Sequence, residues 1–186
     1  MSRVLILGSL CMGDQERDPG TLYNGHSFKI GNLQPGFGIP WVAANGVLYC
    51  EFNLLTGISW NELDENGLIY GKPCMIDGFR FMCRIASGAD DEWAAVIDAI
   101  NKDSSLLRWQ PVYSWCQSSH TNYQNHKICR GGNWPQELHH IAPDKKDPRV
   151  GWRPVLEPIG DNEITIEQIP LGSDLIIWGG NHCVRG

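Results

Sequence analysis

The dipeptide Asp77-Gly78 is the feature that most constrains how this chain can fold. It separates the apolar run 73–76 from residues 79–85, in which apolar side chains at odd positions alternate with Arg or Met. A two-residue hairpin turn requires positive φ angles, which Asp and Gly tolerate, and the alternation is typical of a strand with one buried face. The pattern therefore predicts a half-buried antiparallel hairpin. Asn45-Gly46 lies between two further apolar runs and predicts a second hairpin.

Periodic patterns predict a few further elements. Apolar runs predict strands at 3–10 and 27–30 near the N-terminus, and at 163–169 and 174–178 near the C-terminus. Residues 90–100 predict the one convincing helix, because this segment begins with three acidic residues and continues with apolar residues at helical spacing.

Glycine, proline and tryptophan dominate the remaining segments. Residues 31–40 hold three glycines and two prolines, which predicts a loop or the junction between an N-terminal strap and the main body. Residues 104–157 contain four tryptophans and few periodic patterns, so we expect most of this third of the chain to be ordered loop packed under aromatic side chains. Such loops commonly carry binding sites.

The composition excludes several classes of protein. Of the 186 residues, 42% are hydrophobic and 19% charged, which suffices for one compact domain and excludes long-range disorder. The net charge is −6 and Lys and Arg are scattered, so we expect no nucleic acid partner. The apolar run 4–7 is far shorter than the roughly 20 residues that cross a bilayer, and no secretion signal is recognisable, so we expect cytoplasmic synthesis and no membrane insertion. The seven cysteines form no Cys-x-x-Cys pair, which favours reduced thiols.

Two blocks in the second half of the chain carry a resemblance to a known family. Arg130-Gly-Gly-Asn-Trp134 is followed by Gly151-Trp-Arg-Pro-Val155. Their order and spacing resemble the C-type-lectin-like domain of the formylglycine-generating (sulfatase-modifying factor) type. The chain is also similar to uncharacterised phage and Gram-positive bacterial proteins with a Tyr-Ser-Trp-Cys segment and a closing Gly-Trp-Arg-Pro-Val-Leu-Glu, here Gly151 to Glu157. The resemblance covers roughly residues 54–157.

The resemblance implies an α+β fold of the C-type-lectin-like kind, rich in loops, with short antiparallel sheets and one or two helices. We expect an N-terminal β strap at 1–40, a lectin-like core domain at 41–158 and a C-terminal β extension at 159–186. The function implied is a non-enzymatic binding module, such as a phage or prophage virion structural or accessory protein. Its partner would be a protein or a glycan bound through the 110–150 loop face, with homo-oligomers or virion assembly as further expectations.

The oxidase chemistry of formylglycine-generating enzymes does not carry over. These enzymes bind copper through a cysteine pair that begins shortly after the Arg-Gly-Gly block. Here the corresponding residues 135–140 contain no cysteine, and a soft monovalent copper ion requires thiolates. We therefore expect no cofactor, and keep as an alternative an enzyme of the same superfamily with altered metal ligands.

A zinc site is a weaker alternative. Cys116, His120, His126 and Cys129 have the side chains of tetrahedral zinc sites, but their spacing matches no standard finger. Exposed histidines and buried thiols explain the same residues, so we expect no metal. His139-His140 could form a metal or acid–base cluster, although neighbouring side chains in a strand point to opposite faces.

Residues 117–126 are the strongest candidate for recognition. They are rich in Ser, Asn, Tyr and His without an apolar anchor, which is typical of adaptable binding surfaces and also of an ordinary solvated loop. Trp134 joins this set either as part of the surface or as a core ring. The candidate ligand-binding residues are Ser119, His120, Asn122, Tyr123, Asn125, His126 and Trp134. The residues expected to be structural are Arg130, Gly131, Gly132, Trp152 and Arg153.

Overall fold

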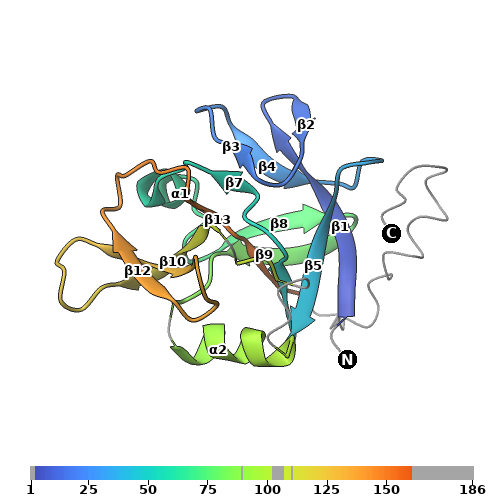
Figure 1. The fold of residues 1–186 in the computed structure, drawn as a ribbon. Helices are drawn as coiled ribbons and strands as arrows, with labels where there is room; N and C mark the ends of the chain where they lie inside the picture. The colour runs from blue at the N-terminus through green and yellow to red at the C-terminus, as the bar shows by residue number, and fades with distance from the viewer. Residues whose placement is uncertain (1–2, 89, 102–106, 110, 161–186) are drawn as a thin grey trace.

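Two curled β-sheets form the body of the protein in the computed structural model, which describes residues 3–88, 90–101, 107–109 and 111–160 (Figure 1). The eight-stranded sheet has the order β2-β1-β5-β6-β14-β9-β8, with β4 paired to β1. Its strands are β1 (Arg3–Met12), β2 (Gln15–Arg17), β4 (Phe28–Gly31), β5 (Gly38–Ala44), β6 (Val47–Cys50), β8 (Lys72–Ile76), β9 (Phe79–Arg84) and β14 (Val155–Pro158).

The second sheet has six strands in the order β12-β11-β10-β13-β7-β3. They are β3 (Thr21–Leu22), β7 (Leu55–Thr56), β10 (Tyr113–Ser119), β11 (Lys127–Gly131), β12 (Leu138–Ile141) and β13 (Val150–Trp152). The β10–β13 and β3–β7 pairs are parallel, and the other pairs of this sheet are antiparallel.

The expected α+β fold with short sheets is wrong. The described residues are mostly β, and the two sheets form a β-sandwich or half-barrel rather than a lectin-like α+β domain. The error lies in 104–157, where β10 to β13 and the start of β14 take the place of much of the expected loop. In β10 the consecutive residues Ser114, Trp115 and Cys116 are all buried. A strand buried on both faces shows no alternation of polar and apolar residues, so periodicity does not detect it.

Both hairpins predicted from turn dipeptides are confirmed. Asp77 and Gly78 have φ angles of 51° and 83°, and Ile76 pairs with Phe79 across the turn between β8 and β9. Asn45 and Gly46 have φ angles of 52° and 78° between β5 and β6. The strands predicted at 3–10 and 27–30 correspond to β1 and β4.

The predicted helix is also confirmed, and a second, shorter one accompanies it. In α2 (Asp90–Ala99), Trp93, Val96 and Ile97 are buried. The helix α1 (Trp60–Glu65) begins at a capping box in which Ser59 and Glu62 bind each other's backbone N–H groups. Six residues are too few to show helical periodicity, so the sequence pattern does not indicate α1. No helix in the part of the chain that the structure describes is long and apolar enough to span a membrane.

The core consists of two clusters on opposite faces of shared strands. On β5, Trp41 belongs to the larger cluster between the sheets, whereas Val42 belongs to the cluster that packs against α2. The first strand also contributes to the larger cluster through Leu5, Leu7 and Leu10, and β1 is hydrogen bonded to β5. The N-terminal segment and the main body therefore share one core. The strands expected at 163–169 and 174–178, and the C-terminal extension beyond residue 160, lie outside the described residues.

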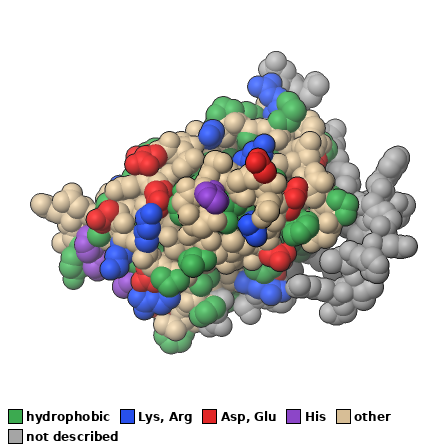
Figure 2. Space-filling model, turned by 90° about the horizontal axis from the view of Figure 1, so that it is seen from above, with side chains coloured by type: hydrophobic (Ala, Val, Ile, Leu, Met, Phe, Trp, Pro, Cys, Tyr) green, Lys and Arg blue, Asp and Glu red, His purple; other side chains and the backbone are tan. Residues whose placement is uncertain are grey.

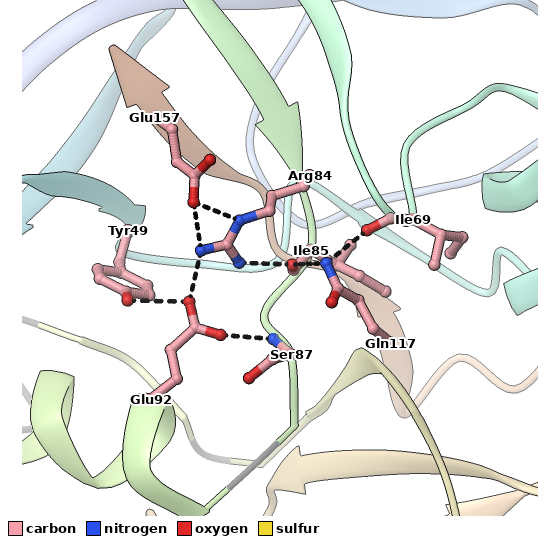
Figure 3. Close-up of polar contacts among 8 residues, drawn as sticks. All are labelled: Tyr49, Ile69, Arg84, Ile85, Ser87, Glu92, Gln117 and Glu157. Atoms are coloured by element: carbon pink, nitrogen blue, oxygen red, sulfur yellow. Dashed lines mark hydrogen bonds and ion pairs between the residues drawn. The ribbon is translucent and has the colours of Figure 1, made fainter. Parts of the chain in front are cut away.

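A partly buried polar network attaches α2 to the larger sheet (Figure 3). Arg84 on β9 donates to Glu92 of α2 at 2.7 Å and to Glu157 of β14 at 2.8 Å. The hydroxyl group of Tyr49 and the backbone N–H group of Ser87 also donate to Glu92. Although burial opposes ionisation, the hydrogen bonds from Arg84 and Ser87 and the charge of Arg84 lower the pKa of Glu92, so the carboxylate stays charged at neutral pH.

Candidate functional site

Three histidines and one tyrosine meet at the edge of the six-stranded sheet. His120, Tyr123 and His126 come from the turn between β10 and β11, and His140 comes from β12; we call these four residues the ring cluster. The Tyr123 ring stacks on His140 with 3.9 Å between centroids. His120 and His126 lie 4.6 and 5.1 Å from His140. His140 is therefore the centre of the cluster. In Figure 2 histidine side chains gather at the left end of the molecule, which is the β10–β12 end in Figure 1.

The backbone of the β10–β11 turn holds the ring cluster in place. The N–H group of His120 donates to the carbonyl of His126 at 2.9 Å, and that of His126 donates to Tyr123 at 3.1 Å. Asn125 has a φ angle of 67°, a left-handed conformation that Asn tolerates better than most residues. The N–H group of Asn122 donates to Nδ1 of His120 at 3.1 Å. These contacts hold the turn that carries His120, Tyr123 and His126.

The rings of His126 and His140 share a hydrogen bond. Their Nδ1 atoms lie 2.8 Å apart, so one ring donates and the other accepts. Loss of hydration and the neighbouring His120, His126 and His139 lower the pKa of His140. The arrangement therefore requires at least one neutral imidazole.

We expect the His126→Gln substitution to raise the pKa of His140, because it removes a positive charge that opposes protonation. An NMR titration of the His140 imidazole protons measures this, and His26→Gln, outside the cluster, is the control.

A histidine pKa that is lowered on folding means that the unfolded chain binds protons more readily. The contribution to stability is thus present above the unfolded pKa of about 6.5 and declines as the pH falls below it. An unchanged His140 titration would contradict the arrangement.

The other candidate residues occupy different places. Ser119 accepts a hydrogen bond from the ammonium of Lys127 at 3.1 Å, beside the cluster. Trp134 lies in the β11–β12 loop, at the opposite end of β11, and is 66% exposed. Trp134 is therefore not a core ring. The expected 110–150 loop face consists of two separate surfaces, one at the β10–β11 turn and one at the β11–β12 loop.

The weaker zinc alternative is not assembled. Cys116 and Cys129 are fully buried and belong to different core clusters on opposite faces of the sheet. Burial raises the pKa of Cys116 to about 12. Within the described ranges, no group of three or more His, Cys, Asp or Glu residues is arranged to hold a metal ion.

The arginines and glycines of the two sequence blocks stabilise irregular backbone. Arg153 is 2% exposed and donates to Ser114 and to backbone carbonyl groups, whereas Arg130 donates to the carbonyls of Gln136 and Gly88. Gly131 and Gly132 have φ angles of 101° and 92°. A Cβ atom on Gly132 would lie 2.5 Å from the Tyr113 ring, so only glycine fits there. The Trp152 ring is 1% exposed and packs against Phe28.

His140 is the residue that sequence reasoning missed as a partner of the 117–126 turn. Pairing of Ile128 with His140 places β12 beside the start of β11. Only the register of β11 and β12 indicates that His140 lies beside the turn, and the periodicity of the sequence does not reveal this register.

The fold and the ring cluster define a two-sheet β protein with a partly exposed group of aromatic rings at one sheet edge. No protein-family model, curated protein or solved structure matches this chain.

Proposed function

We propose that the protein is a binding module that recognises a protein partner through the ring cluster. The observation that carries this proposal is the exposure of Tyr123, which is 51% accessible although its ring is stacked on His140. Tyrosine is enriched at protein interfaces, where a few aromatic side chains supply most of the binding energy.

Preorganisation supports the same function. Side chains that are ordered before binding lose less conformational entropy when a partner arrives. The turn hydrogen bonds and the ring stacking fix His120, Tyr123 and His126 in this way. Neutral imidazole groups both donate and accept, so they can pair with the polar groups of a polypeptide backbone.

A protein is favoured over a glycan because of how the rings lie. Sugar recognition by an aromatic side chain uses an open ring face, and one face of Tyr123 is covered by His140. Trp134, the most exposed indole among the described residues, lies at the other end of β11 and does not extend the cluster into a platform.

The test compares Tyr123→Ala/His126→Ala with the wild-type chain and with Tyr70→Ala. Tyr70 is 67% exposed and lies outside the cluster, so its substitution is a matched control. A partner captured from the source lysate is identified by mass spectrometry and purified, and its Kd is measured by calorimetry. We expect the double variant to fold normally and to bind about thirtyfold more weakly, the equivalent of about 2 kcal/mol, while Tyr70→Ala binds like wild type.

Two outcomes would overturn this proposal. Equal loss of affinity in both variants would show that the effect is not specific to the cluster. The second outcome is that the wild-type chain and Tyr70→Ala bind immobilised glycans while the double variant does not. That result would identify a sugar as the partner.

A further inference from the structure

A small cavity lies between the β8–β9 hairpin, β4 and β13, away from the ring cluster. Its volume is about 80 Å³, and its lining includes Lys29, Lys72, Cys74, Cys83 and Trp152. Two cysteines, two lysines and one tryptophan therefore line the same space.

The two cysteines face each other across the hairpin. Cys74 pairs with Phe81 and Cys83 with Lys72, which makes the cysteines diagonal neighbours on one face. Their side chains are hydrogen bonded to each other. Cys74 is half-buried, whereas Cys83 is 4% exposed. Cys74 is thus the thiol that a small molecule can reach first.

The surroundings favour the thiolate at Cys74. The hydrogen bond from Cys83 and the charge of Lys72 lower the pKa of Cys74, against the effect of burial. The same hydrogen bond and burial raise the pKa of Cys83. At Cys50, by contrast, burial raises the pKa to about 12. The thiolate is the nucleophilic form of cysteine, so Cys74 combines access with reactivity.

Trp152, which also lines the cavity, carries a polar group without a partner. Its Nε1–H group is buried and has no hydrogen-bond partner among the described residues. A buried N–H group without an acceptor is costly, and most such groups in folded proteins are paired. A ligand with an acceptor oxygen would satisfy it.

We propose that this cavity is a reactive thiol site for small hydroperoxides, in which Cys74 is the attacking thiol and Cys83 the resolving thiol. The small volume admits hydrogen peroxide or a short alkyl hydroperoxide. Lys72 and the Trp152 N–H group supply donors to the peroxide oxygens.

The reaction balances as a two-electron oxidation of the dithiol. The Cys74 thiolate attacks the terminal peroxide oxygen, the O–O bond breaks, and a sulfenic acid forms at Cys74. The leaving hydroxide or alkoxide takes a proton and departs as water or an alcohol. The Cys83 sulfur then loses its proton and attacks the Cys74 sulfur, which forms the disulfide and releases water.

The disulfide is expected to be easily reduced. Diagonal neighbours in a sheet have Cα atoms about 7 to 8 Å apart, and disulfides favour about 4.4 to 6.8 Å. Closing the bond therefore shifts the strands of the hairpin, and this strain raises the reduction potential.

The experiment treats the wild-type chain, Cys74→Ser and Cys83→Ser with equimolar hydrogen peroxide, followed by peptide mass spectrometry. We expect the wild type to lose two hydrogens as a Cys74–Cys83 disulfide that dithiothreitol reverses. Cys83→Ser should accumulate a sulfenic acid at Cys74 that dimedone traps, and Cys74→Ser should stay unoxidised at Cys83. Cys11→Ser is the control, because Cys11 is also partly exposed but does not line the cavity, and it should react like the wild type.

A second pair of variants tests the site without touching the cysteines. Lys72→Met should slow oxidation of Cys74 several-fold, whereas Lys145→Met, another exposed lysine far along the chain, should not. Trp152→Phe, which keeps a ring but removes the N–H group, should also slow it. Three results would each overturn the proposal. They are oxidation of Cys11 before Cys74, a rate of Cys74 oxidation equal to that in the urea-unfolded chain, and an unchanged rate of Cys74 oxidation in Lys72→Met.

Discussion

Replacing Arg153 with Met is expected to lower the free energy of unfolding by about 3 to 5 kcal/mol. The guanidinium group donates to the Ser114 hydroxyl at 2.9 Å and to the carbonyls of Cys50, Glu51 and Arg108. Burial lowers the pKa of Arg153 to about 10, which still leaves it charged at neutral pH. The methionine would fill much of the volume but leave these buried acceptors without donors, and unsatisfied buried acceptors carry the full cost of desolvation.

Urea unfolding of both chains, followed by tryptophan fluorescence, measures the difference. Arg80→Met is the matched control, because Arg80 is exposed on β9 and its loss should change the free energy of unfolding by no more than about 0.5 kcal/mol. Equal stability of the two variants would show that Arg153 does not hold the loops together.

The second large effect is expected for Gly151→Ala on β13. A Cβ atom there would lie 2.2 Å from the carbonyl oxygen of Leu55 and 3.0 Å from the Asn53 side chain. Gly151 is paired with Thr56, so the clash falls on backbone that cannot turn aside without breaking the β13–β7 pairing. We expect a loss of at least about 2 kcal/mol in the free energy of unfolding.

Gly31→Ala is the comparison for this substitution. The nearest atom to a Cβ on Gly31 is the Cys11 sulfur at 3.7 Å, an ordinary contact. Thermal unfolding should show a lower Tm for Gly151→Ala and an unchanged or slightly higher Tm for Gly31→Ala, because alanine costs less backbone entropy than glycine. A Tm for Gly151→Ala equal to that of the wild type would contradict the close approach of β13 to β7.

Local sequence patterns predicted the elements that depend on local chemistry. The turns at Asn45-Gly46 and Asp77-Gly78 require residues that tolerate positive φ, so the dipeptides alone located both hairpins. The helix α2 buries one face only, which leaves a periodic pattern that is visible in the sequence.

The remaining features depend on contacts between distant segments. Trp115 and Cys116 are both buried because β10 lies between two core clusters, and this erases the alternation that marks a strand. The resemblance to the lectin-like family therefore led to a fold class that the sheets contradict. His140 joins the ring cluster through the register of β11 and β12, and Trp152 lines the same cavity as Cys74 and Cys83 from a strand about 70 residues later. No local pattern encodes such pairings.

The central place of β14 in the larger sheet has a consequence for how the chain folds during synthesis. β14 pairs with β6 on one side and β9 on the other, so it joins strands that precede it by about a hundred and by about seventy residues. Until residue 158 leaves the ribosome, the edge of β6 and the edge of β9 that β14 occupies have no partner, and unpaired edges invite aggregation. Because such long-range pairing is slow to form, the emerging chain depends on the completion of β14, or on a chaperone, to protect these edges.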